Sequence, residues 1–309
     1  MSKENSGMIY TAVICLGLIT LILWIFFNAA FGKEVKEKQR EISVILYSVG
    51  TDGWESFREG VKQAENDFSV NINIVILRED ADAQEQLEIM NREVSNGAEA
   101  LAVAVVDGKE LYEQMLKDSV SVPIVSVESG FDDNIPLISA DNYEMGKRLG
   151  EEILKDFSEE KELTVALANE RNMRDSVEKR KQGLLDALEG KAKVISLETA
   201  INGEDADAVV ALHKEALLSL TEKDKTSLSR SKYYGIGNTA SVVAALDQGK
   251  IEKLVFQNEF NMGYLAIKTL LQDINGIQNK ENEQIDFYCV SRENLYDMKY
   301  EHLLFPIVE

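Results

Sequence analysis

The chain has 309 residues, of which 45% are hydrophobic and 28% charged, so it has the composition of a folded protein and the length for two lobes. The formal net charge is −21, which argues against nucleic acid as a partner because phosphate binding needs a basic surface. Cys15 and Cys289 lie in separate apolar stretches far apart in the sequence, which argues against a disulfide between them.

The first feature along the chain is an uncharged stretch. After a short tail of residues 1–8, residues 9–31 contain no charged side chain over 23 positions. At about 1.5 Å per residue, a helix of this length spans a bilayer with some tilt. A cleaved signal peptide is the alternative, but its apolar core is usually shorter and "FNAAFG" is a weak cleavage site. The pattern therefore predicts an uncleaved transmembrane anchor.

Residues 32–41 follow as a charged linker, and they bear on the side of the membrane that the rest of the chain faces. Lys33, Lys36, Lys38 and Arg40 would hold this flank in the cytoplasm by the positive-inside rule. Long domains translocate regardless of such charges, so the flanking charges leave the topology open.

Beyond the linker, apolar strand-like runs alternate with amphipathic helical patterns. In the first half, strands are predicted over residues 42–49, 72–77, 100–106 and 122–127, and helices over 54–64, 87–97 and 111–116. In the second half, strands are predicted over 163–168, 193–198, 233–237, 253–257, 285–290 and 303–308, and helices over 176–190, 206–220, 240–249 and 261–274. Near-continuous apolar strands with helices between them predict parallel sheets covered on both faces.

This rhythm predicts an α/β fold of two doubly wound parallel-sheet lobes after the N-terminal helix. We expect lobe 1 to comprise residues 42–141 and 258–278, and lobe 2 to comprise residues 142–257 and 279–309. Ligands of open α/β sheets bind outside the carboxyl ends of the strands. The strand-end loops carry Thr51, Asp52, Trp54, Asp107, Arg174, Asn238, Gln257 and Asn258. One aromatic face and several polar groups suit a neutral polyhydroxyl ligand.

Several of these segments carry a family resemblance in the expected order: "VGTDGWESFREGVKQA", "NGAEALAVAVVDGKEL", "SVPIVSVES", "ISADNYEMGKRLGEEIL" and "GIGNTASVVAALDQGKIEKLVFQNEFNMGYLAIKTL". From about residue 42 to residue 274, the chain resembles the ribose/galactose-type periplasmic binding proteins, whose domain is shared with LacI-type regulators. The resemblance implies two lobes that close on a ligand by a hinge. It places Trp54 at the family's sugar-stacking aromatic and Asp107 at a ligand-binding acid. Neither assignment follows from the residues alone, since Trp54 also fits a hydrophobic staple and Asp107 a helix N-cap.

The chain also departs from the family's pattern. Gly237 stands at the position of a family acid, with Asn238 beside it. Glu178 stands near the position of a family arginine, and Arg174 is the candidate to replace that arginine as a ligand group. Arg180 matches a more structural position. His213 replaces a family ligand residue if the register is right; otherwise it lies on the apolar stripe of a helix. Gln257 and Asn258 fit either ligand contacts or a turn.

We also expect one strand–helix unit of the family to be missing between Ser196 and Tyr233, because the segment has room for only one helix. The second lobe is therefore expected to be reduced, which puts ordinary sugar binding in doubt.

The function that these patterns favour is a membrane-tethered extracytoplasmic solute-binding protein for a sugar, polyol or similar small polar ligand. The resemblance implies an ABC permease or a histidine kinase as its membrane partner. The alternative is a degenerate scaffold that contacts such a partner without binding a ligand. A LacI-type regulator is rejected because an apolar span stands where its DNA-binding helices would be. No cofactor or metal is expected, and neither His213 nor His302 fits a catalytic pattern, so we expect no enzyme.

Overall fold

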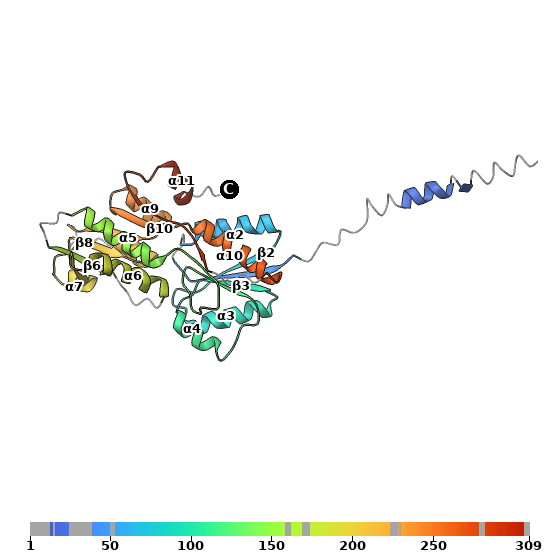
Figure 1. Cartoon of the computed structure of the whole chain (residues 1–309), viewed down its shortest axis with the longest axis horizontal. Helices are drawn as coiled ribbons and strands as arrows, with labels where there is room; N and C mark the ends of the chain where they lie inside the picture. Colours follow the sequence, from blue (N-terminus) through green and yellow to red (C-terminus); the bar gives the residue numbers. More distant parts are fainter. Residues whose placement is uncertain are drawn as a thin grey trace, which may run out of the picture. The chain divides into compact units, whose positions relative to one another are not determined.

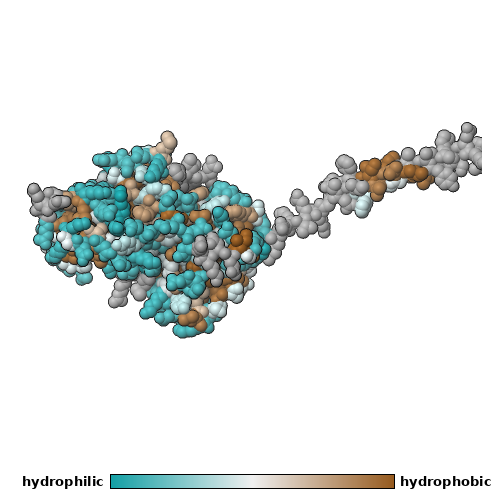
Figure 2. Space-filling model, viewed as in Figure 1, coloured by the Kyte–Doolittle hydropathy of each residue, from teal (hydrophilic) through white to brown (hydrophobic). Residues whose placement is uncertain are grey.

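A computed structural model of the chain describes residues 13–14, 16–24, 39–49, 53–157, 162–168, 174–222, 228, 230–277 and 282–305. The chain divides into two units, residues 1–39 and residues 40–309. In the first unit, residues 13–14 and 16–24 are helical and mainly hydrophobic, as their colouring in Figure 2 shows. Across the described part of the chain, no helix is both long and apolar enough to cross a membrane. The anchor expected over residues 9–31 lies partly outside the described residues.

Residues 40–309 contain two lobes, each built on one sheet, and Figure 1 shows helices on both faces of these sheets. Lobe 1 contains β1 (Glu41–Leu46), α2 (Glu55–Phe68), β2 (Asn71–Ile76), α3 (Ala83–Ser95), β3 (Ala100–Val103), α4 (Gly108–Met115), β4 (Ile124–Val127), β5 (Leu137–Ser139), α10 (Glu259–Ile274) and β11 (Glu283–Gln284). Lobe 2 contains α5 (Asn142–Lys155), β6 (Leu163–Ala168), α6 (Asp175–Leu188), β7 (Ala192–Ser196), α7 (Leu197–Ile201), β8 (Ala208–Ala211), α8 (Lys214–Glu222), β9 (Lys232–Ile236), α9 (Ala240–Asp247), β10 (Lys253–Gln257), β12 (Phe287–Ser291) and α11 (Met298–Leu304).

The two sheets repeat one topology. The strand order is β11-β5-β4-β3-β1-β2 in lobe 1 and β12-β10-β9-β8-β6-β7 in lobe 2. All neighbours pair in parallel except β10 and β12, which are antiparallel. Parallel neighbours put their carboxyl ends at one edge of each sheet, so the loops that follow the strands gather there.

Each sheet has an apolar core on both faces, which explains why its central strands are uniformly hydrophobic. In β1, Val44 and Leu46 point into one core while Ile45 points into another. In β8, Val210 and Val209 divide in the same way. A strand buried on both faces has no polar alternation. The expected parallel sheets, covered on both sides, are confirmed. Polar and charged residues cover most of the visible surface of these lobes (Figure 2).

Close helix pairs hold one face of each sheet. In lobe 1, α2 packs on α10, and a Cβ added at Gly263 would lie 2.2 Å from the carbonyl oxygen of Phe57. In lobe 2, α5 packs on α6, and a Cβ added at Gly146 would lie 1.8 Å from the carbonyl oxygen of Arg180. Both pairs therefore need glycine for the two backbones to approach.

Three chain crossings join the lobes at neighbouring positions. They run from β5 to α5, from β10 to α10 and from β11 to β12. The backbone N–H of Ala140 donates to the Gln257 side chain (3.3 Å), and the N–H of Asn258 donates to the Asp286 carbonyl (2.9 Å). Hydrogen bonds between the crossings tie these three segments together where they connect the lobes.

The structure corrects three expectations. The helix predicted over residues 206–220 is wrong, because β8 and α8 occupy this segment. The strand–helix unit is therefore present, and lobe 2 has a complete sheet. The strand predicted over 303–308 is wrong in its described part, where Leu303 and Leu304 are buried in the last turn of α11. In both segments, a short apolar run fitted helix and strand periodicity equally well.

The third correction concerns the lobe boundary. Residues 279–309 were assigned to lobe 2, whereas β11 pairs with β5 in the sheet of lobe 1. This strand has only two residues, too few for a sequence pattern to reveal it.

Candidate functional site

Trp54 lies where the loop after β1 becomes α2, and its ring is 3% exposed. Its indole N–H donates to the Tyr47 carbonyl oxygen (2.8 Å), and its ring meets the Tyr47 and Phe57 rings edge-on at centroid distances of 5.0 and 5.4 Å. Trp54 thus anchors the start of α2 in the core of lobe 1. The hydrogen-bonded indole is satisfied although it is buried.

Lys214 reaches from lobe 2 to this ring. Its ammonium nitrogen lies 4.7 Å from the centre of the Trp54 ring and donates to the Gly53 carbonyl oxygen (2.7 Å). It also pairs with a carboxylate oxygen of Glu259, at the start of α10, at 2.5 Å. Both charged side chains are almost fully buried. A cation over the indole face, fixed by two oxygens, joins the lobes at this point.

Glu128 forms the second connection between the lobes. It follows β4, has a φ of +64° and is 3% exposed. Its carboxylate accepts hydrogen bonds from the Tyr47 hydroxyl and from Arg180 (3.0 Å), and Arg174 lies 3.8 Å away. Burial acts to raise the pKa of Glu128, but Arg180 and Arg174 outweigh it and hold the pKa below its usual value.

Arg180 is the most enclosed cation of this group. It lies on α6 with 2% exposure and donates from Nε to the Asn142 amide oxygen (2.7 Å) and from Nη1 to the Leu212 carbonyl (3.1 Å). With the Glu128 bond, its guanidinium joins three separate segments. The structural role suggested by its sequence position agrees with these contacts.

Arg174 and Glu215 extend the charged cluster within lobe 2. The guanidinium carbon of Arg174 lies 4.1 Å from the centre of the Tyr47 ring, and Nη2 pairs with Glu215 at 3.0 Å. Burial acts to raise the pKa of Glu215, whereas the His213 hydrogen bond and Arg174 lower it to about 2. Glu215 is therefore ionised at neutral pH, and Arg174 lies against Tyr47 of the other lobe.

His213 lies in the bend between β8, which ends at Ala211, and α8, which begins at Lys214, so the alternative that placed it on a helix stripe is wrong. Its Nδ1 lies 2.9 Å from a Glu215 carboxylate oxygen. Its buried Nε2 has no hydrogen-bond partner among the described residues. A buried nitrogen of this kind is the group that a polar ligand would satisfy.

The structure places the remaining candidate residues as follows. Asp107 is the N-cap of α4 and accepts from the Glu110 N–H (3.0 Å). Gln257 lies at the crossings between the lobes, and Asn238 is 8% exposed in the middle of the loop between β9 and α9. Thr51 and Asp52 lie outside the described residues. Trp54, Arg174, His213, Asn238 and Gln257 share the region between the lobes, and their roles toward a ligand stay predictions.

Sequence reasoning missed four residues that build this region: Tyr47, Glu128, Lys214 and Glu215. Each follows a strand of its sheet, so strand-end position was an available signal. It was too weak to select them, because every strand-end loop carries polar residues. The pairing of buried charges between lobes depends on tertiary structure that periodicity does not report.

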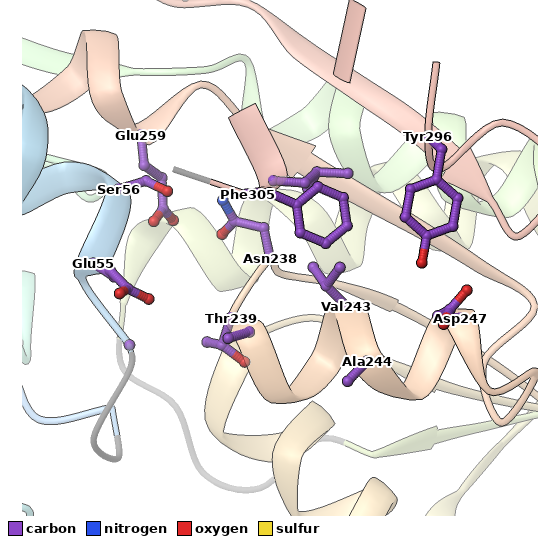
Figure 3. A pocket seen from close by; sticks show the side chains of 13 residues that line it. Glu55, Ser56, Asn238, Thr239, Val243, Ala244, Asp247, Glu259, Tyr296 and Phe305 are labelled. Carbon is purple, nitrogen blue, oxygen red and sulfur yellow. The ribbon is translucent and has the colours of Figure 1, made fainter. Parts of the chain in front are cut away.

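Space between the lobes is uneven. The centre, bordered by Glu128, Arg180, Lys214 and Gln257, leaves about 10 Å³, which is room for about one water molecule. Nearer the mouth, a cavity of about 420 Å³ lies between the starts of α2 and α9 and the C-terminal α11 (Figure 3). Within the described part of the chain, no cluster of three or more His, Cys, Asp or Glu side chains is suited to a metal ion.

Comparison with known proteins agrees with this architecture. The periplasmic binding protein domain family matches residues 42–219. A D-ribose/D-allose-binding protein of Pseudomonas aeruginosa is 22% identical over 258 residues, which cover 79% of this chain and 77% of that protein. Both the family and this relative are binding proteins, and the present chain is a binding protein rather than an enzyme.

Solved structures show the same fold. One is a carbohydrate-transporter solute-binding protein of Agrobacterium radiobacter in complex with D-arabinose, with a TM-score of 0.76, 20% identity and coverage of 87% of this chain and 100% of that one. Another is a glucose-galactose binding protein of Geobacillus stearothermophilus, with a TM-score of 0.72, 14% identity and coverage of 84% and 100%. On the family match over residues 42–219, the chain belongs to the periplasmic binding protein domain family.

Proposed function

We propose that the chain is a membrane-tethered extracytoplasmic solute-binding protein that takes a sugar or a similar small polar solute between its lobes. Family membership and relatives named for binding ribose, allose and arabinose support the solute class. The uncharged stretch over residues 9–31 supports the tether. Lobe closure around the solute would be the signal that a membrane partner detects.

The observation that carries this proposal is the contact between Trp54 and Lys214. The indole face of lobe 1 is turned toward lobe 2 and is covered there by an ammonium group at 4.7 Å. An aromatic face opposite a hydrogen-bonding lobe is an arrangement that suits the C–H face of a sugar. In the present arrangement Lys214 occupies that face, so a solute must displace the ammonium from the ring.

Calorimetric titration of the full-length chain in detergent micelles with a panel of pentoses, hexoses and polyols tests the proposal. A solute with an affinity of about 1 μM, present at about 1 mM, stabilises the fold by about 4 kcal/mol and raises the melting temperature by several degrees. One saturable binder with a matching rise in melting temperature is the expected result. A cooperative melt that no solute changes would contradict it.

A second candidate function is a scaffold that contacts a membrane partner without binding a solute. The nearly filled centre between Glu128, Arg180, Lys214 and Gln257 favours it, because the chain's own side chains satisfy one another there. This candidate predicts that lobe closure is independent of the solute panel while a partner is still bound. Co-purification with the chain's own permease or histidine kinase, unchanged by any solute, would support it.

We further propose sensing beside a histidine kinase rather than delivery to an ABC permease, because an uncleaved anchor keeps the lobes at a fixed distance from the membrane. Protease treatment of intact cells tests the extracytoplasmic position. Digestion of residues 40–309 without lysis is expected, and protection until lysis would place them in the cytoplasm.

A further inference from the structure

The cavity at the mouth of the cleft has the size of a ligand site and is lined by both lobes. Its volume is about 420 Å³, within the range of small-molecule pockets. Gly53, Glu55 and Ser56 contribute from the start of α2 in lobe 1, and Asn238 and Asp247 contribute from lobe 2 (Figure 3). A solute bound here would touch both lobes and therefore favour their closure.

The ionisable side chains that line this cavity are acidic, apart from the tyrosine on its rim. They are Glu55, Asp247 and Glu259, and no Lys, Arg or His lies among the described residues of the lining. Glu259 is already paired with Lys214. Glu55 has no ion pair with any described residue, and Asp247 faces the Tyr296 hydroxyl. The cavity therefore offers two carboxylates to a cation, in a protein whose net charge is already −21.

Asn238 adds a separate indication of a ligand. Its residue is 8% exposed, and its side chain points into the cavity between Glu259 and Phe305 (Figure 3). No described residue forms a hydrogen bond with its amide group. Its amide atoms are not fully enclosed, so a group inside the cavity can reach and satisfy them. A polar group of a bound solute would do so.

The outer wall of the cavity is aromatic and apolar. Tyr296 and Phe305, at either end of α11, stack with their ring centres 5.7 Å apart and an interplanar angle of 3°. Val243 and Leu304 complete this side. Aromatic faces beside carboxylates attract ammonium groups that carry a short carbon skeleton.

From these observations we infer that the mouth cavity binds a small solute carrying a protonated amine. The ammonium group is held by the Asp247 carboxylate beside Tyr296 and Phe305, and Glu55, on the opposite side of the cavity, adds to its negative charge (Figure 3). The Asn238 amide binds another polar group of the solute, and the carbon skeleton lies against Tyr296 and Phe305. This inference rests on the proposed solute-binding function and narrows its ligand to amine-bearing solutes.

Matched probes test the inference on the full-length chain in detergent micelles. D-glucosamine is compared with D-glucose, and putrescine with 1,4-butanediol, by calorimetric titration at one ionic strength. In at least one pair, the amine is expected to bind at least about tenfold more tightly than its neutral counterpart, as a charge-assisted hydrogen bond requires. D247N should weaken amine binding about tenfold, and E55Q should weaken it by less, because Glu55 lies on the opposite side of the cavity. E189Q, which removes an exposed carboxylate outside the cavity, should leave amine binding unchanged.

Asn238→Ala provides a second variant that should fold, since it breaks no hydrogen bond with a described residue. It is expected to melt like wild type and to weaken amine binding. Equal binding of amine and neutral probes, or amine binding that D247N and E55Q leave intact, overturns the inference while the proposed function stands. If neither these four probes nor the neutral sugar panel binds, both the inference and the proposed function fail.

Discussion

The α2–α10 pair of lobe 1 and the α5–α6 pair of lobe 2 pack in the same way, but one equivalent side chain lies in the core in lobe 1 and between the lobes in lobe 2. In lobe 1, Gly263 of α10 packs against the carbonyl of Phe57, which lies three residues before Gly60 in α2. In lobe 2, Gly146 of α5 packs against the carbonyl of Arg180, which lies three residues before Gly183 in α6. Phe57 and Arg180 thus hold equivalent places. Phe57 is in the apolar core beside Trp54, whereas Arg180 crosses to Glu128 of the other lobe.

This difference separates the backbone packing that the two lobes share from the side chains that fill the cleft. Backbone packing is shared because two helices can approach this closely only at glycine. The side chain at the equivalent position, Phe57 or Arg180, can pack in the core of its own lobe or contact the other lobe. In lobe 2 it serves the contact, and a buried network of charges fills the cleft as a result.

The largest expected effect separates these two uses. Arg180→Met leaves the buried Glu128 carboxylate without its closest cation and should lower the free energy of unfolding by about 3–5 kcal/mol. Phe57→Met keeps an apolar side chain of similar size and should cost only about 1–2 kcal/mol. Urea denaturation followed by circular dichroism measures both values. A Glu128→Gln change added to Arg180→Met should recover part of the loss.

If Arg180→Met proves no worse than Phe57→Met, the two side chains are equivalent in energy as well as in place. The contrast between core and cleft would then be lost.

The shared part of the comparison predicts equal effects in the two lobes. Gly146→Ala and Gly263→Ala each drive a Cβ into a carbonyl oxygen of the partner helix and should each cost about 3 kcal/mol. Gly130→Ala is the control, because its Cβ would make an ordinary contact 3.5 Å from Leu137. Thermal melting of the three variants provides the test. A loss in only one lobe would show that the helix pairs are not equivalent.

Acid titration examines the charged network of the cleft. The pKa of Glu215 is lowered from 4.5 to about 2, so its contribution is full above about pH 4.5 and is lost as the pH falls toward 2. Its side chain is 35% exposed, which reduces the expected contribution to about 1–2 kcal/mol. Burial raises the pKa of Glu259, so its contribution to the free energy of unfolding has the opposite pH dependence. That contribution is full below the usual pKa of a glutamate and is lost as the pH rises.

Glu215→Gln should therefore flatten the loss of stability between pH 4.5 and pH 2, measured by urea denaturation at each pH. The matched control is Glu189→Gln, which removes an exposed carboxylate from the surface of lobe 2. Identical pH profiles for the two variants would argue against a charged Glu215 network.

The smallest expected effect concerns helix caps, which the lobes share. Asp107→Ala removes the side-chain acceptor of α4 and should cost about 1 kcal/mol, and Thr239→Ala should cost a similar amount at α9. Asp107→Asn keeps an acceptor and should stay close to wild type. Thermal melting resolves these differences. A large loss for Asp107→Asn would show that the carboxylate does more than cap the helix.

Patterns in the sequence were sufficient for the scaffold. Apolar runs such as "LTVALA" match β6 (Leu163–Ala168) residue for residue, because a strand buried on both faces has no other arrangement of side chains. The segment 206–220 was misassigned because Val209, Val210, His213, Ala216 and Leu217 fit helical spacing by coincidence. Short apolar runs are ambiguous in this way.

The cleft was predicted only in part. Trp54, Arg174 and His213 do lie between the lobes; strand-end position pointed to Trp54 and Arg174, whereas only the family resemblance pointed to His213. Lys214 and Glu128 were missed because their roles come from partners more than 40 residues away in sequence, Gly53 for one and Arg180 for the other. No local pattern records which buried charges will meet across two lobes.

The emission of Trp54 tests most directly the claim that a solute displaces Lys214 from the indole face. A full-length chain with Trp24→Phe leaves Trp54 as its only tryptophan. Titration with a neutral sugar that binds by calorimetry should shift this emission, with the same dissociation constant as the heat, because the ammonium 4.7 Å from the ring moves away. Calorimetric binding of such a sugar with an unchanged Trp54 emission would contradict the account, since the sugar would then bind without reaching the Trp54–Lys214 contact.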